Sequence, residues 1–448
     1  MNFEKIKEAV RAAAEKFGIE EYEIYYMSDS NLSVETLKHE ISTFSSGVSG
    51  GLCFRCLVDG KMGYASTELI LPEEMEMLVE SAKENAINTE KTEICGIFSG
   101  SEKYDTPKNK PYTPVSAEEL KGVALEIQEK NYASSDKICD GTQSCAMTFG
   151  FSVCIANSHG LDLENKVGTS IVYAAAVVKD NEESSDAFKM EKYEKESFDS
   201  TDIANKATEL ALEKLGATGV ESGKYNIVIS GKQMRSLLSA FSPAFSAKNA
   251  RMGLSLLAGK EGQTVASEIV TLTDDPMREG NDIVTPFDAE GVATYRKNVI
   301  ENGVLKTLLH NLESATLAGV KSTGNASKAG YSAPVGISPY SFCIEAGNYS
   351  FDELLGVCEN GIYITELKGL HAGTNAVTGD FSLESAGFMI ENGKKTKAVK
   401  SFTVAGNFFT LLKDVAALSN KVDTGVPTSF TSYGSPDVLI RNMSVAGK

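Results

Sequence analysis

The stretch Lys368–Lys394 constrains the fold more than any other part of the chain, because a turn-rich loop leads directly into a hairpin signal. Glycines and short polar side chains fill its first half, and such residues favour tight loops with local hydrogen bonds. The apolar run Ala386–Ile390 follows, and then Asn392-Gly393, a pair typical of a two-residue type I′ turn. The stretch therefore predicts a polar loop held by a rigid hairpin.

Loops held in this way often carry binding groups. The candidate binding residues of this loop are His371, Asn375, Thr378, Gly379 and Asp380. The alternative is a surface turn without a ligand, and the composition of the loop does not decide between the two interpretations.

The chain has 448 residues, of which 42% are hydrophobic and 23% charged, so we expect two or three globular domains. Prolines interrupt the pattern of helices and strands near residue 110, which indicates a linker there. The predicted division is an N-terminal α/β domain at 1–100, a proline-bearing linker at 101–115, a middle α+β domain at 116–222 and a β-rich C-terminal domain at 223–448.

The fold class that these patterns predict is α+β, with helix-plus-antiparallel-sheet domains followed by a larger, mainly antiparallel β domain. The predicted helices begin near Phe3, Pro72, Ser116, Ile203, Gly231 and Phe408, the last one running to Leu418. The predicted strands include Glu23–Met27, Val34–His39, Gly51–Val58, Met147–Ala156, Ser170–Val178, Asn226–Ser230, Glu268–Leu272, Val292–Ile300, Val304–His310 and Val438–Arg441. Pro243 should kink or end its helix.

Composition excludes several classes of function. A net charge of −18 argues against binding to nucleic acid, because such affinity comes mainly from basic residues that displace counterions. The longest apolar run, Ile171–Val178, is far shorter than the roughly 20 residues of a membrane helix. The charged N-terminus does not resemble a signal peptide, and eight scattered cysteines suit a reducing compartment, so we expect a cytoplasmic protein.

No metal site is predicted from the residues themselves. The four histidines, His39, His159, His310 and His371, lie far apart in the sequence, whereas a helical zinc site needs two histidines one turn apart. Cys53 and Cys56 form one C-x-x-C pair inside a predicted strand, where residues three apart point to opposite faces. We interpret these cysteines as small buried residues.

Catalytic motifs are also missing. The sequence contains no nucleophile elbow, no Walker sequence and no dinucleotide-binding glycine pattern. The carboxylate groups Asp274-Asp275 and Asp288-Ala289-Glu290 could pair as acid and base, although such clusters more often form turns.

Five segments, taken together and in this order, resemble the TldD/PmbA family: Gly51–Tyr64, Phe287–Thr294, Ile300–Leu305, Thr323–Ala326 and Asn375–Gly393. The resemblance runs through nearly the whole chain. It implies a role in proteolysis, such as the maturation of peptide antibiotics or the turnover of antitoxins, in a family named for effects on DNA gyrase. It also implies dimers that enclose a cavity.

Within that family the TldD type carries a zinc-binding H-E-x-x-x-H, and the PmbA type, also called TldE, does not. By approximate placement, Ser239, Ala240 and Ala244 stand at the positions of its two histidines and glutamate. None of the three can bind zinc or activate water. The resemblance therefore implies a PmbA/TldE-type subunit with no catalytic residue and no metal of its own, and zinc is expected only in a TldD-type partner.

Three functions follow from this interpretation. The first is a non-catalytic subunit that pairs with a TldD-type metallopeptidase, or with itself, around a peptide substrate. The second is a self-sufficient homodimeric hydrolase that uses His371, Asp380 and Asp288. The third is a peptide-binding module without catalysis, so the sequence leaves open whether the chain is an enzyme. Under the first function we expect the loop at His371 to face the cavity and to contact peptide or the partner.

Overall fold

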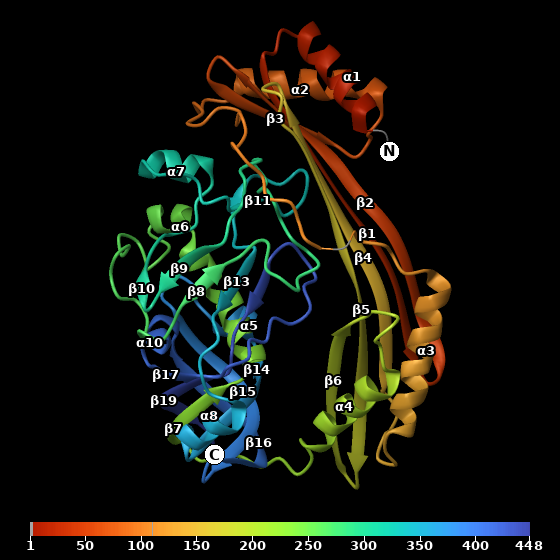
Figure 1. The fold of residues 1–448 in the computed structure, drawn as a ribbon, viewed down its shortest axis with the longest axis vertical. Helices are drawn as coiled ribbons and strands as arrows, with labels where there is room; N and C mark the ends of the chain where they lie inside the picture. The colour runs from red at the N-terminus through yellow and green to blue at the C-terminus, as the bar shows by residue number, and fades with distance from the viewer. Residues whose placement is uncertain (1–2, 110) are drawn as a thin grey trace.

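One long antiparallel sheet forms the N-terminal half of the computed structural model, which describes residues 3–109 and 111–448. Its six strands lie in the order β3-β2-β1-β4-β5-β6 (Figure 1). Their bounds are β1 Glu21–Leu37, β2 Glu40–Val58, β3 Lys61–Thr67, β4 Gln143–Asn157, β5 Asp162–Asp180 and β6 Glu183–Lys192. Strands that the sequence suggested for two separate domains therefore belong to one continuous sheet.

The sequence predicted two strands, at Glu23–Met27 and Val34–His39. The structure instead has the single strand β1, which runs from Glu21 to Leu37. The polar residues between them stay extended, since β1 pairs along its whole length with β2 on one side and with β4 on the other. Two flanking ladders satisfy the backbone of this segment, although its side chains carry little hydrophobic signal.

Four helices cover one face of this sheet: α1 Phe3–Lys16, α2 Met75–Asn88, α3 Ala117–Ala133 and α4 Ser200–Leu212. Helices α1 and α2 pack with Ile24 and Phe54 at one end, and α3 and α4 pack with Val34 and Val172 at the other. Tyr25 follows Ile24 along β1, so its side chain points to the opposite face of the sheet, where it packs against the C-terminal domain. Because side chains alternate between the two faces of a strand, one face of the sheet packs against the helices and the other packs against the C-terminal domain.

The C-terminal domain is built on a small closed barrel. Its five strands are β7 Gly223–Ile229, β14 Gly361–Lys368, β15 Asp380–Glu391, β16 Lys394–Asn407 and β19 Val438–Ala446. Pairing of β16 with β19 closes the barrel, and β17 Val415–Leu418 adds to β19. Only β7 and β14 run parallel within it, so the barrel is mainly antiparallel.

A second C-terminal sheet has the strand order β10-β9-β8-β13-β18. The strands outside the barrel are β8 Leu272–Asp274, β9 Lys297–Glu301, β10 Val304–Leu305, β11 Ala326–Ser327, β12 Gly336–Ile337, β13 Ser341–Ile344 and β18 Ser432–Gly434. The helices of this domain are α5 Gly231–Phe241, α6 Ala247–Arg251, α7 Leu312–Ala318, α8 Phe351–Cys358, α9 Leu370–Gly373 and α10 Phe408–Lys413. A 3-10 turn follows α5 at Ser242–Phe245, and another precedes α2 in the N-terminal half, at Pro72–Glu74. The predicted α+β class is confirmed.

Several predicted elements are too long. The strands predicted over Val292–Ile300 and Val304–His310 are shorter in the structure, as β9 and β10, and the strand predicted over Glu268–Leu272 lies further along the chain, as β8. Side chains accept from the backbone N–H groups of Val292, Ala293 and His310, at positions where ladder bonds were predicted. The helix predicted from Phe408 ends at Lys413, since Val415–Leu418 pairs with β19 instead. Among the residues that the structure describes, no helix combines the length and apolarity needed to cross a membrane.

Candidate functional site

A hollow of about 540 Å³ lies between α5 and α9. It is lined by one of the five candidate binding residues and by two of the three positions at which the family resemblance places the TldD-type zinc motif. His371 enters it from α9, and Ser239 and Ala240 enter it from α5. The remaining lining residues are Arg235, Ser236, Leu370, Thr374 and Tyr433.

Helix α5 is fixed at both ends by local chemistry. The Ser230 hydroxyl accepts a hydrogen bond from the Gln233 N–H at its start. After Phe241 the chain tightens into the 3-10 turn that contains Pro243, as the sequence predicted. Ala244 lies in this turn and is 1% exposed, so it is buried and does not line the hollow.

The loop from Asn375 to Asp380 uses its polar groups on itself. The Asn375 Oδ1 accepts hydrogen bonds from the N–H groups of Val377 (3.0 Å) and Thr378 (3.2 Å). The backbone N–H of Asn375 donates to the Asp380 carbonyl, and the Asn375 carbonyl accepts from the Gly379 N–H. Of the five predicted residues, only His371 lines the hollow, and the other four give the loop its shape.

Asn407, at the end of β16, holds the loop from the other side. Its side-chain N–H₂ donates to the Thr378 carbonyl (2.8 Å) and to Asp380 Oδ1 (2.9 Å), while its Oδ1 caps α10. The pKa of Asp380 is lowered, first by its bond to Asn407 and then by its bond to Thr378. Gly379 has φ +83°, and a Cβ there would lie 2.5 Å from the Phe409 ring. A larger residue at position 379 is therefore excluded by both strain and space.

The hollow does not fit a zinc ion. Structural and catalytic zinc sites need three or four nitrogen, sulfur or carboxylate ligands, whereas the lining supplies a single imidazole beside hydroxyl, methyl and guanidinium groups. Within residues 3–109 and 111–448, no group of three or more His, Cys, Asp or Glu is placed to hold a metal ion. The histidines occupy four separate surroundings: His39 stacks on Tyr132, His159 lies near Glu21, His310 contacts Ser314, and His371 lines the hollow.

The two carboxylate groups considered as acid and base serve the fold. Asp274 is fully buried and accepts hydrogen bonds from the Tyr340 and Ser341 N–H groups. Asp288 accepts three backbone N–H bonds, two within its own turn and one from Ala326. Burial raises the pKa of Asp288, the nearby Glu290 carboxyl raises it further, and the three N–H bonds oppose both effects. Asp288 and His371 line different cavities, so they do not form one site.

Some residues of the hollow were not predicted from the sequence. Tyr433 reaches it from β18, and its hydroxyl lies 2.9 Å from the Ser242 hydroxyl at the end of α5. Arg235 is on the wall and pairs with Asp423. No local pattern marks either residue, because the segments that meet here are far apart in the chain.

Comparison with known families confirms the resemblance. Models of the PmbA/TldA metallopeptidase family match in order: domain 1 over residues 22–86, the central domain over 110–215 and the C-terminal domain over 222–447. The metalloprotease PmbA of Escherichia coli O157:H7 is 24% identical over 438 residues, which are 95% of this chain and 92% of that protein.

Solved structures show the same fold. A Thermotoga maritima crystal structure, described in connection with modulation of a DNA gyrase, has a TM-score of 0.89 and 29% identity, covering 99% of this chain and 100% of that one. The crystal structure of TldE from Thermococcus kodakarensis has a TM-score of 0.88 and 24% identity, with coverage of 99% and 100%.

Proposed function

The chain belongs to the PmbA/TldA metallopeptidase family, and from this premise we propose that it is a non-catalytic PmbA/TldE-type subunit. Its partner would be a TldD-type zinc metallopeptidase, and the two chains together would form the chamber in which peptides are processed. The proposal places the chain in proteolysis or peptide maturation and assigns the zinc to the partner alone.

One observation carries this proposal. The α5 segment that would hold the metal ligands of a TldD-type chain presents Ser239 and Ala240 to the hollow, with His371 as its one imidazole. A serine hydroxyl and a methyl group cannot complete a zinc site or activate a water molecule. The hollow retains hydrogen-bonding groups that suit the backbone of a peptide, so binding without hydrolysis matches its chemistry.

The self-sufficient hydrolase is less well supported. Its three groups were His371, Asp380 and Asp288, but Asp288 lies in another cavity with both oxygens engaged by backbone N–H groups. The Asp380 carboxylate is engaged by Asn407. A general base needs hydrogen-bond reach to the proton that it removes, and no shared reaction centre brings these groups together.

Co-purification from the native cell, followed by zinc analysis of each chain, tests the assignment. We expect a relative with H-E-x-x-x-H to accompany this chain, and we expect zinc to be lost when that relative is removed. About one zinc per molecule of this chain in isolation, lost on His371→Ala, would overturn the assignment. Peptide cleavage by the isolated chain after removal of metal would favour the second function.

We also propose that the loop of His371, Asn375, Thr378, Gly379 and Asp380 contacts the peptide or the partner. We expect His371→Ala to lower peptide cleavage by the reconstituted pair while leaving the melting temperature nearly unchanged, because its side chain lines the hollow. Asn375→Ala should instead cost about 1 kcal/mol of stability, since its side chain caps two N–H groups in the manner of a helix cap.

Cleavage and thermal melting, measured on the same preparations, separate the two roles. Thr396→Ala serves as the matched control, because Thr396 is an exposed β16 residue of the same hairpin, and its hydroxyl donates to the Met389 carbonyl. Cleavage by the His371→Ala pair at the wild-type rate would contradict the proposal and leave the loop with a structural role alone.

A further inference from the structure

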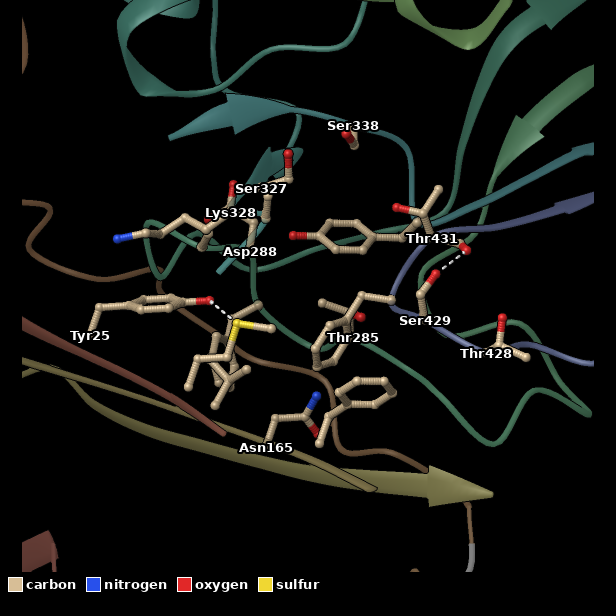
Figure 2. Close-up of a pocket in the computed structure, with 18 residues that line it drawn as sticks. Tyr25, Asn165, Thr285, Asp288, Ser327, Lys328, Ser338, Thr428, Ser429 and Thr431 are labelled. Carbon is tan, nitrogen blue, oxygen red and sulfur yellow. Dashed lines mark hydrogen bonds between the residues drawn. The ribbon is translucent and has the colours of Figure 1, made fainter. Parts of the chain in front are cut away.

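A second cavity, of about 420 Å³, lies between the long N-terminal sheet and the C-terminal domain (Figure 2). Strands β1, β4 and β5 form its floor, and C-terminal segments near residues 285–289, 327–329, 338–340 and 428–431 form the rest. This volume lies within the range of about 300–1,000 Å³ typical of small-molecule sites, which often lie between domains. The proposed function makes no use of this cavity.

Aromatic rings make up much of its wall. They come from both sides of the domain junction: Tyr25, Phe151, Phe287, Tyr340 and Phe430. The rings of Phe151 and Phe430 lie 5.1 Å apart, so the sheet and the C-terminal loop contact each other here. The Tyr340 hydroxyl donates to the Ala326 carbonyl, which fixes its ring in the wall. Such a wall favours a flat or branched apolar group.

Lys328 supplies the positive charge of the cavity. Figure 2 shows its side chain extending along one end, where Nζ lies 4.5 Å from the centre of the Tyr25 ring. The ion pairs within residues 3–109 and 111–448 do not include Lys328, whereas the buried Arg55 and Lys297 are each paired with a carboxylate. The Lys328 side chain bonds instead to the Cys53 thiol. A half-buried ammonium in this position attracts an anion, because burial without a counterion is costly.

The neighbouring carboxyl groups do not neutralise Lys328. Glu23 is held by Arg55 through two hydrogen bonds of 2.8 and 2.9 Å. Asp288 lines the cavity, but its two oxygens accept three backbone N–H bonds, so they are engaged by the backbone and not by Lys328. Burial lowers the pKa of Lys328, an effect that a bound carboxylate would reverse.

We propose that this cavity binds an amphipathic carboxylate, with its apolar group among the aromatic rings and its carboxylate at Lys328. The C-terminal residue of a peptide and a free aromatic acid share this chemistry. The hydroxyls of Ser327, Ser338, Ser429 and Thr431 on the wall can bind an adjoining amide, which favours the peptide end. The site does not depend on a partner subunit, so its test is separate from that of the proposed function.

Isothermal titration calorimetry on the full chain, without a partner, tests this site. The probes are N-acetyl-phenylalanine, its amide, and a pentapeptide ending in phenylalanine with a free or an amidated carboxyl group. We expect each acid to bind at least about tenfold more tightly than its amide, as for a hydrogen bond to a charged group. Tighter binding of the peptide identifies a peptide end as the ligand, and tighter binding of the acetylated residue identifies a free acid.

Variants at Lys328 locate the binding. Lys328→Met should lower the affinity for the acid about tenfold and abolish its preference over the amide, because methionine keeps the apolar stem without the charge. Lys321→Met is the matched control, since Lys321 is an exposed lysine seven positions earlier in the same segment. Phe430→Ala should weaken acid and amide alike. Equal binding of acid and amide, unchanged binding in Lys328→Met, or no binding to the wild-type chain would each overturn the proposal.

Discussion

Replacement of Arg55 by methionine is expected to destabilise the protein by about 3–5 kcal/mol, the usual cost of leaving one member of a buried ion pair unpaired. Arg55 and Glu23 lie directly opposite each other on β2 and β1 and are 7% and 2% exposed. Two hydrogen bonds join the guanidinium to the carboxylate, at 2.8 and 2.9 Å. Arg55→Met leaves Glu23 buried without its partner and removes a positive charge near Glu290.

Urea unfolding followed by circular dichroism measures this loss. The double variant Arg55→Met with Glu23→Leu should recover much of the stability, because it removes both buried charges together. The control is Lys137→Met, which breaks a 2.7 Å pair with Asp180 in which both side chains are more than 40% exposed. That change should cost less than about 1 kcal/mol. A loss in Arg55→Met no larger than in the control would contradict the buried-pair argument.

Asp274→Ala is the second change with a large expected effect, again about 3–5 kcal/mol. The carboxylate of Asp274 joins four groups: its Oδ1 accepts from two backbone N–H groups, and its Oδ2 contacts Lys297 Nζ at 3.2 Å and Asn325 Nδ2 at 2.7 Å. Lys297 is 6% exposed. Without Asp274 this ammonium keeps only the Asn325 amide oxygen as a hydrogen-bond acceptor among the described residues.

The adjacent aspartate provides a matched control. Asp275 accepts a 3.3 Å bond from the Met277 N–H and lies 3.7 Å from the half-exposed Arg296, so Asp275→Ala should cost about 1 kcal/mol or less. The two variants can be compared by their urea midpoints. Equal losses would show that the buried network does not stabilise the domain as the geometry indicates.

These neighbouring aspartates show why the sequence could not assign their roles. Asp274-Asp275-Pro276 indicates a turn or a pair of acids, and both residues look alike in composition. Their difference comes from Lys297 and Asn325, which lie 23 and 51 positions away. Pairing of β8 with β9 places Lys297 opposite Asp274, and the segment directly before β11 brings in Asn325. A buried network of this kind depends on non-local contacts, so no local pattern identifies it.

Local chemistry did determine the hairpins and caps. Asn302-Gly303 and Asn392-Gly393 both have positive φ at each residue, as a type I′ turn requires, and each joins two antiparallel strands. Ser116 caps α3 and Asn407 caps α10, at the two places where helices were predicted to begin. The physical reason is that these features need only a few consecutive residues, whose own side chains and backbone satisfy the geometry.

The sequence by itself determined the α+β class and the family, because each rests on residue types at positions close together or in a fixed order. Only the tertiary structure decided that the N-terminal strands form one sheet and that His371 and Ser239 line the same hollow. It also placed Lys328 beside the aromatic rings of a second cavity. Each of these arrangements joins segments that are distant in the chain, and the free energy that brings them together comes from burial and strand pairing across the whole domain.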